Sequence, residues 1–319
     1  MKIIVCGAGV IGTLYAARLK AAGCDVTVLA RGSRLVDIER HGLVLHNLTT
    51  GERSSTQVAV TGQLHPNDHY DLALVAVRRD QLSVVLPVLA SNKNIPSVLF
   101  MLNYPSGSAA LIQSLGPHRV VLGFPGAGGT LDGNVVQYAM IAQQPTTIGE
   151  PGGERTGRLR TLIGILRASG LKVQSDRNMD AWLMAHAFFI ASICGAVYLA
   201  DGSCGRLSRD PTLLSLMLDG VSQGFSVVRA LGQPVHPFAL NLLFTRLPRP
   251  FAAGYWRRFF ARPIAEFIFA RHALHACAEM RMLAADCRTL LAKSGVSAPA
   301  FIRLSDAIDT YATASREKP

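Results

Sequence analysis

The chain has 319 residues, 49% of them hydrophobic and 17% charged, and it carries a formal net charge of +11 at pH 7. This length suits one large domain or two ordinary ones, with ample apolar material for a core. Disorder requires low hydrophobicity and high charge, and a long coiled coil requires many charged positions, so both classes are excluded. The positive charge is compatible with nucleic acid, an anionic surface or an anionic small ligand.

The first thirty residues predict a strand, a helix and a second strand. Residues 2–6 (KIIVC) are a short apolar run, residues 10–22 carry apolar side chains at helical spacing, and residues 26–29 are apolar again. This order is the βαβ unit of a parallel sheet. Helical patterns separate several of the further apolar runs, which lie at 43–45, 57–60, 72–77, 97–102 and 120–123. The alternation predicts a doubly wound α/β domain.

The hydrophobic pattern changes in the later part of the chain. We expect residues 134–141 and 146–148 to form a strand pair that closes the sheet. From Met179 onward the patterns are helical, at 179–200, 210–231, 237–246, 263–294 and 299–313. We therefore expect an α/β domain at 1–176, followed by a helical domain at 177–319.

Residues 181–200 are twenty residues without formal charge, which is long enough to span a bilayer. The stretch is alone and contains His186 and Ser192, so a helix buried inside the helical domain is favoured over a membrane span. The N-terminal apolar run is too short for a signal peptide and ends in a glycine turn. The six cysteines include no CxxC pair, so we expect reduced thiols and no metal site. Together these features predict a cytoplasmic protein with no membrane partner.

A glycine-rich turn follows the first predicted strand and opens the first predicted helix. Its GxGxxG sequence consists of Gly7, Ala8, Gly9, Val10, Ile11 and Gly12. In this context the first glycine allows the tight turn, the second leaves room for a pyrophosphate, and the third lets helix and strand approach. The amides and the positive end of the helix dipole would face the phosphates. We expect a dinucleotide at this turn.

The end of the second predicted strand favours NADPH over NADH. An acidic residue there would bind the ribose 2′-hydroxyl group, but this chain has Arg31. Arg31 can hold a 2′-phosphate, with Arg34 assisting and Ser33 donating a hydrogen bond. The alternative for Arg31 is a solvated surface arginine.

The whole chain resembles the ketopantoate reductase family, most specifically over residues 1–150. The likeness rests on the glycine motif, Arg31, VAVRRDQ at 75–81, Asn103, LDGN at 131–134, TTIGE at 146–150 and MDAW at 179–182. It implies that 1–176 is a Rossmann-type, dinucleotide-binding domain, that 177–319 is an all-helical substrate and dimerisation domain, and that a cleft lies between them. It also implies reduction of a 2-keto acid by hydride transfer from NADPH, in pantothenate synthesis.

The resemblance also implies site residues. Besides the glycine motif and Arg31, the expected cofactor contacts are Arg78, Asn103 and Gly129, with Arg78 standing where the family has a lysine. Asn103 would contact substrate as well, although Tyr104 replaces the glycine that usually follows it. Glu279 falls at the glutamate of the family.

The resemblance fails at the general acid. A family lysine two residues after a tryptophan protonates the new alkoxide, and that position is Met184, whose thioether has no proton to donate. The positions of two asparagines and a substrate-binding serine fall on Phe188, Ser192 and Phe267. We therefore expect a more apolar pocket.

A later predicted helix carries candidates for a replacement general acid. His272, His275 and Glu279 are spaced i, i+3 and i+7, which predicts one helical stripe. Imidazole titrates near neutrality, so we expect His275 to donate the proton while Glu279 orients it or the nicotinamide ribose. The alternative is that these side chains serve helix packing or the surface.

The expected function is NADPH-dependent reduction of ketopantoate (2-dehydropantoate) to pantoate, or of a related carbonyl substrate. The alternative is an NADPH-binding relative that has lost or changed catalysis because of Met184.

Arginines and aromatic residues interleave at 246–262, but this stretch matches no nucleic-acid motif. We expect it to connect helices or to contact a second subunit in a homodimer, with no nucleic-acid partner.

Overall fold

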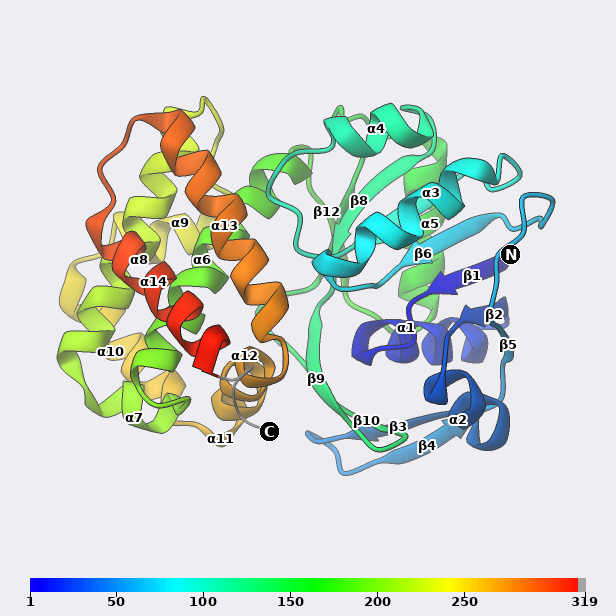
Figure 1. The fold of residues 1–319 in the computed structure, drawn as a ribbon, viewed down its shortest axis with the longest axis horizontal. Helices are drawn as coiled ribbons and strands as arrows, with labels where there is room; N and C mark the ends of the chain where they lie inside the picture. The colour runs from blue at the N-terminus through cyan, green and yellow to red at the C-terminus, as the bar shows by residue number, and fades with distance from the viewer. Residues whose placement is uncertain (315–319) are drawn as a thin grey trace. The chain divides into compact units, whose positions relative to one another are not determined.

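The computed structural model describes residues 1–314, without the side chains of His272 and Ala314, and it divides into two compact units (Figure 1). The first unit comprises Met1–Leu102 and Ser108–Met179. The second runs from Asp180 onward and also includes Asn103–Gly107, a short segment that follows a strand of the first unit in sequence.

An eight-stranded sheet forms the centre of the first unit. In sheet order its strands are β12 (Val173–Ser175), β11 (Thr146–Gly149), β8 (Val120–Phe124), β7 (Val98–Met101), β6 (Leu72–Val75), β1 (Lys2–Cys6), β2 (Asp25–Leu29) and β5 (Ala59–Thr61). Neighbours are parallel except β8 and β11. The central strands are buried on both faces, which explains their continuous apolar sequences. The predicted doubly wound α/β fold is confirmed.

Helices and a 3₁₀ turn connect these strands (Figure 1). They are α1 (Val10–Ala21), α2 (Ser33–His41), η1 (Arg79–Gln81), α3 (Leu82–Ser91), α4 (Ala109–Leu115) and α5 (Gly157–Ala168). Helix α1 contacts strands of both sheets in this unit, so it is buried on nearly all sides. That packing explains why α1 has no polar face.

A second, four-stranded sheet corrects one prediction. It has the order β4 (Arg53–Thr56), β3 (Leu43–Asn47), β10 (Val135–Met140) and β9 (Ala127–Asp132). The expected pairing of residues 134–141 with 146–148 is wrong, because β10 pairs with β9 and β3 whereas β11 pairs with β8 and β12. Adjacent apolar runs thus entered different sheets, because strand partners are chosen by tertiary packing.

From Asp180 onward, the regular elements of the described residues are all helical, as predicted. Its elements are α6 (Met179–Leu199), α7 (Cys204–Arg209), α8 (Pro211–Ala230), α9 (Phe238–Thr245), α10 (Arg249–Phe260), α11 (Pro263–Ala265), the π-helical η2 (Glu266–Arg271), α12 (His272–His275), α13 (Cys277–Ser294) and α14 (Pro299–Ala314). Side-chain caps set some of the boundaries. Asp210 accepts hydrogen bonds from the amides of Thr212 and Leu213, and Pro211 opens α8.

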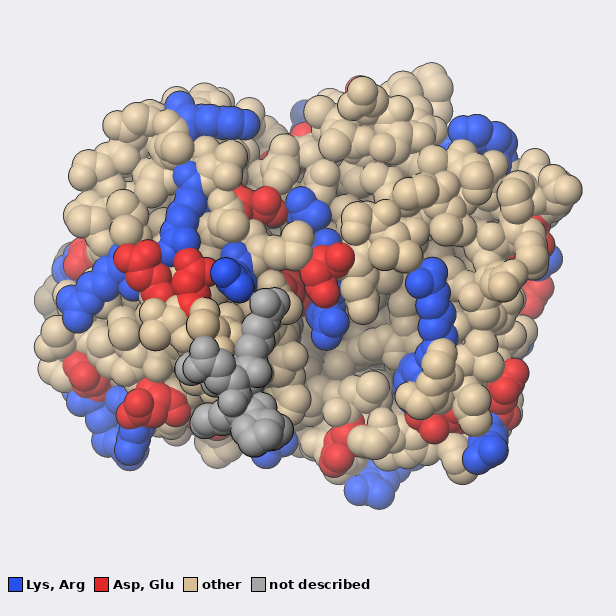
Figure 2. Space-filling model, viewed as in Figure 1, with Lys and Arg blue, Asp and Glu red and all other residues tan. Residues whose placement is uncertain are grey.

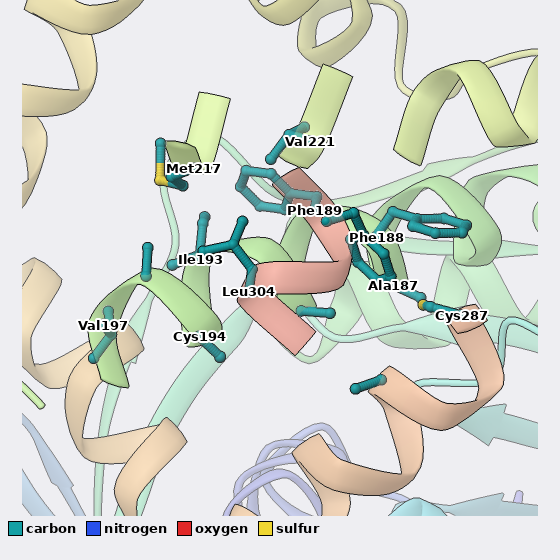
Figure 3. Packing of buried hydrophobic residues seen from close by; sticks show 14 of the residues in the cluster. Ala187, Phe188, Phe189, Ile193, Cys194, Val197, Met217, Val221, Cys287 and Leu304 are labelled. Carbon is teal, nitrogen blue, oxygen red and sulfur yellow. The ribbon is translucent and has the colours of Figure 1, made fainter. Parts of the chain in front are cut away.

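The apolar stretch at 181–200 is a core helix of this unit. Within the described residues, α6 is the one helix long and apolar enough to cross a membrane, and 89% of its most apolar window is buried. The side chain of Phe188 packs on Gly224 of α8, and its ring meets the Phe301 ring of α14 edge-on at 4.9 Å between centroids. Figure 3 shows Phe188 among other buried side chains of this core, including Val221 of α8 and Leu304 of α14. Helix packing therefore accounts for the apolar composition of α6.

The basic, aromatic stretch at 246–262 largely becomes α10. Trp256 and Phe260 point into the core of the unit, where Trp256 also contacts Phe189 of α6. Arg249 is paired with Asp219 of α8 at 2.5 Å. Trp256 and Phe260 are therefore used for helix packing, whereas Phe251 and Tyr255 are exposed.

Candidate active site

The glycine motif forms the turn between β1 and α1, with a different steric requirement at each glycine. Gly7 has a φ of +108°, and a Cβ on it would lie 2.7 Å from the carbonyl oxygen of Ala76. A Cβ on Gly12 would lie 1.8 Å from the carbonyl oxygen of Gly7. A Cβ on Gly9 would meet no atom within 4 Å. The first and third glycines are therefore required by the backbone, whereas Gly9 borders open space.

The N-terminus of α1 is suited to an anion. Its N-cap is Gly9, so no side chain caps the first turn, and no acidic residue lies in that turn. The free amides and the helix dipole together favour negative charge there. The residues present thus fit a dinucleotide pyrophosphate.

Arg31 follows β2 and is exposed at the rim of a pocket. The pocket has a volume of about 220 Å³ and is lined by Leu29, Arg31, Gly62, Gln63, Leu64 and Val88. An exposed guanidinium beside a cavity can pair with a phosphate without a large desolvation penalty. No carboxylate lines this pocket, so nothing in its lining would repel a 2′-phosphate.

Arg34 does not take the role expected for it beside Arg31. Its guanidinium donates to the carbonyl oxygen of Ala8 at 3.0 Å, to Thr13 Oγ1 at 3.1 Å and to the carbonyl oxygen of Asn134 at 3.2 Å. Desolvation lowers its pKa, and the nearby Asp37 partly opposes that shift. The expectation that Arg34 assists at a 2′-phosphate is wrong, because its donors are directed at the backbone around the glycine turn.

Arg78 and Gly129 lie elsewhere in the first unit. Arg78 follows β6, is half exposed and pairs with Asp80 at 3.3 Å. Gly129 lies in β9, where a Cβ would come 2.3 Å from the carbonyl oxygen of Gln137 and 2.8 Å from Val10 Cγ1. Gly129 therefore lets β9 pass close to the start of α1. Direct contact of either residue with the cofactor stays a prediction.

Asn103 and Glu279 meet inside the second unit. The Asn103 amide nitrogen donates to Glu279 Oε1 at 3.0 Å, and the residues are 8% and 6% exposed. Asn103 Oδ1 is buried and has no hydrogen-bond partner among the described residues. Leaving such an acceptor unsatisfied costs about 1–3 kcal/mol, so this oxygen marks a place for a ligand that donates a hydrogen bond. The sequence indicated both residues but not their contact.

The predicted stripe of His272, His275 and Glu279 is wrong. Helix α12 ends at His275, and the backbone breaks at Ala276 (φ −116°, ψ 32°) before α13 begins. His275 is exposed, with its Nδ1 2.7 Å from the carbonyl oxygen of Arg271, whereas Glu279 is buried. The i, i+4 rule applies only along a continuous helix. The side chain of His272 lies outside the described part of the chain.

The residues at the family's polar positions lie in apolar surroundings. Met184 is 8% exposed and belongs to the core cluster of the second unit, as does Phe188. Ser192 is fully buried, with its Oγ 3.1 Å from the place of a Cβ on Gly220 of α8. Phe188 and Ser192 pack against α8, and the more apolar substrate pocket stays a prediction. Phe267 is 6% exposed.

Comparison with known proteins agrees with this fold. Residues 3–153 match the family model described as ketopantoate reductase PanE/ApbA. A 2-dehydropantoate 2-reductase of Mesorhizobium japonicum is 30% identical over 268 residues, covering 71% of this chain and 77% of that protein. The uncharacterized oxidoreductase YkpB of Bacillus subtilis is 24% identical, covering 74% of this chain and 78% of its own.

Solved structures share the fold over nearly the full length. A putative ketopantoate reductase from Ralstonia solanacearum has a TM-score of 0.78 at 17% identity and covers 98% of both chains. D-Mandelate dehydrogenase with NADH and anilino(oxo)acetate has a TM-score of 0.79 at 17% identity and covers 100% of both.

The sheet, the glycine turn and the helical second unit define a Rossmann-type, nicotinamide-dependent oxidoreductase. More specifically, the chain belongs to the ketopantoate reductase family. It is an NADP-dependent oxidoreductase that acts on CH–OH groups.

Proposed function

We propose that this chain reduces the ketone of ketopantoate, or of a related 2-keto acid, with NADPH. The observation that carries the proposal is the buried Asn103–Glu279 pair, in which Asn103 Oδ1 lacks a partner. NADPH, when bound, supplies the hydride. Gly7–Gly12 would hold its pyrophosphate and Arg31 its 2′-phosphate, with Arg78 adding positive charge.

The Glu279 carboxylate fixes the orientation of the Asn103 amide. A carboxylate only accepts hydrogen bonds, so the NH₂ group must face it and Oδ1 must face away. One N–H then remains to orient the substrate carbonyl, and Oδ1 can accept from a hydroxyl or amide group of the ligands. This division of roles supports reduction of a carbonyl group held beside the nicotinamide.

The alkoxide formed by hydride transfer needs a proton. His275 remains our candidate donor, because an imidazole ring can carry a transferable proton on either nitrogen. Its Nδ1 lies beside the carbonyl oxygen of Arg271, which leaves Nε2 for proton exchange. Met184 cannot replace the family lysine, because a thioether carries no ionisable proton.

The second candidate function is NADPH binding without reduction of ketopantoate. The buried, apolar environment of Met184 favours it. We expect NADPH to give a fluorescence or thermal-shift signal under either function. Only the reductase should also lose nicotinamide absorbance when 2-keto acids are added, and the panel should include ketopantoate and aryl 2-oxo acids. Binding without turnover on the whole panel would contradict the reductase proposal.

Replacing Met184→Lys tests whether the missing acid is the main defect. If the rest of the pocket is intact, this variant should create or raise ketopantoate reduction. Burial lowers the pKa of a lysine, so the new activity should fall as pH rises through that lowered pKa. The matched control is Met184→Leu, which keeps an apolar side chain and should add no activity. NADPH oxidation measured across pH checks both variants, and equal rates would show that the site lacks more than an acid.

A further inference from the structure

Arg34 bridges three separate parts of the first unit. From the first turn of α2, its Nε donates to the carbonyl oxygen of Ala8, inside the glycine motif. Its two terminal nitrogens donate to Thr13 Oγ1 on α1 and to the carbonyl oxygen of Asn134, between β9 and β10. All three distances lie between 3.0 and 3.2 Å, and the side chain is half-buried.

The bond to Ala8 determines which way the next amide points. The carbonyl oxygen of Ala8 also accepts a hydrogen bond from Thr13 Oγ1 at 3.2 Å, so two donors hold it on one side of the turn. In a trans peptide the C=O and the following N–H point in opposite directions. The N–H of Gly9 therefore points away from Arg34 and Thr13. Gly9 is also the glycine that borders open space.

The geometry requires an arginine. A guanidinium is a planar fork with five N–H donors, which can reach acceptors on three elements at once. A lysine offers the same charge from a single nitrogen on a flexible stem. Its three donors all radiate from that one nitrogen, so it can reach neighbouring acceptors such as Ala8 and Thr13 but lacks the fixed fork that spans the glycine turn, α1 and the β9–β10 turn.

We infer that Arg34 is a positioning residue, which holds the glycine turn in the conformation that binds the dinucleotide pyrophosphate. The inference rests on the proposed function, because it assigns the turn to that ligand. Pyrophosphate is common to NADPH and NADH, whereas the 2′-phosphate belongs to NADPH alone. Arg34 and Arg31 should therefore affect the two cofactors differently.

Four variants separate these roles: Arg34→Met, Arg34→Lys, Arg31→Ala and the matched control Arg40→Met. Arg40 lies on the same helix and is exposed, so its variant removes one charge without touching the turn. Dissociation constants for NADPH and NADH would be measured by nucleotide fluorescence. Turnover at saturating NADPH would be measured with whichever 2-keto acid the wild type reduces.

We expect both Arg34 variants to weaken NADPH and NADH by the same factor, roughly tenfold for the loss of a bridging hydrogen bond. Turnover at saturating cofactor should stay at the wild-type rate, which a general loss of structure would not allow. Arg31→Ala should weaken NADPH far more than NADH, and Arg40→Met should leave both unchanged.

Three results would overturn the inference. Wild-type cofactor affinity in Arg34→Lys would mean that a positive charge alone suffices. Wild-type affinity in Arg34→Met would mean that the glycine turn needs no support from this side chain. A loss of affinity for NADPH alone would make Arg34 a ligand of the 2′-phosphate. If the Arg34 variants fail to fold, Thr13→Val should give a smaller but equal loss for both cofactors, and no loss would overturn the inference. A wild type that binds neither cofactor would instead remove the proposed function itself.

Discussion

At the scale of single residues, the most informative feature is a side-chain amide whose orientation is set by a carboxylate. Asn103 and Glu279 lie 176 positions apart in sequence and meet in a buried hydrogen bond. The sequence indicated both side chains through a family likeness, but not that one fixes the other. Their energies in catalysis should therefore be coupled and not additive.

A double-mutant cycle with Asn103→Ala and Glu279→Gln tests that coupling. Glutamine presents both a donor and an acceptor, so the Asn103 amide would lose its fixed orientation. We expect kcat/KM to fall about tenfold in Glu279→Gln, because a tenfold change corresponds to about the free energy of one hydrogen bond. The double variant should be little worse than Asn103→Ala alone. Additive losses in the steady-state rates would mean that the two residues act separately.

At the scale of elements, the strand–turn–helix of β1 and α1 combines two uses of glycine. Gly12 permits close packing of α1, whereas Gly9 faces open space. Gly12→Ala should lower the melting temperature strongly, because its Cβ would overlap the carbonyl oxygen of Gly7. Gly9→Ala should melt near the wild-type temperature and yet bind NADPH more weakly. Thermal unfolding and fluorescence titration of both variants check this, and an unstable Gly9→Ala would contradict it.

Strand β11 is joined to α5 by a buried ion pair. Glu150 is 2% exposed and accepts from Arg158 Nε at 2.9 Å and Nη2 at 2.5 Å, and from the Thr156 hydroxyl group. Burial by itself would raise the pKa of Glu150, but the hydrogen bonds from Arg158 and Thr156 and the Arg158 charge outweigh it and lower the pKa. The ionised carboxylate is therefore more stable in the folded state than in the unfolded chain.

This sign predicts how stability depends on pH. A carboxyl group with a lowered folded pKa stabilises the fold above its unfolded value, about 4.3, and the contribution is lost as pH falls through the folded pKa. Glu150→Gln should destabilise the protein by about 1–3 kcal/mol at neutral pH. Chemical unfolding at several pH values should show this difference shrinking below about pH 4. A difference independent of pH would contradict the ionised pair.

At the scale of the whole molecule, the net charge is +11. The face that Figure 2 shows nevertheless has no single continuous patch of Lys and Arg side chains among the described residues. There the Lys and Arg side chains of the described residues are interspersed with Asp and Glu. A positive net charge of this kind can still attract anionic cofactors and carboxylate substrates, and the attraction weakens as salt is added.

We predict a cytoplasmic homodimer that associates through the helical unit. Two large apolar side chains there, Phe238 of α9 and Phe251 of α10, are 73% and 71% exposed. Fractionation without detergent should leave the protein in the soluble fraction, and sedimentation should give twice the chain mass. If Phe251→Glu in α10 lowers the mass to that of one chain, the contact involves this helix. A monomeric wild type would contradict the predicted dimer.

Much of the first unit follows from local sequence. Apolar runs separated by helical patterns indicated the parallel sheet, and glycine spacing after a strand indicated the dinucleotide turn. These features are readable because burial and backbone conformation are imposed by residues close together in the chain. The sequence likewise determined that position 184 carries no general acid, since a methionine side chain has no proton to give in any fold.

Only the tertiary structure decided the rest, because those features depend on residues distant in sequence. It placed β10 and β11 in different sheets, ended the stripe of His275 and Glu279 at Ala276, and turned Phe188 onto Gly224. It also directed Arg34 to the backbone of the glycine turn and left one oxygen of Asn103 without a partner. Hydrogen-bond partners across a fold are set by packing, which periodicity and spacing along one chain do not encode.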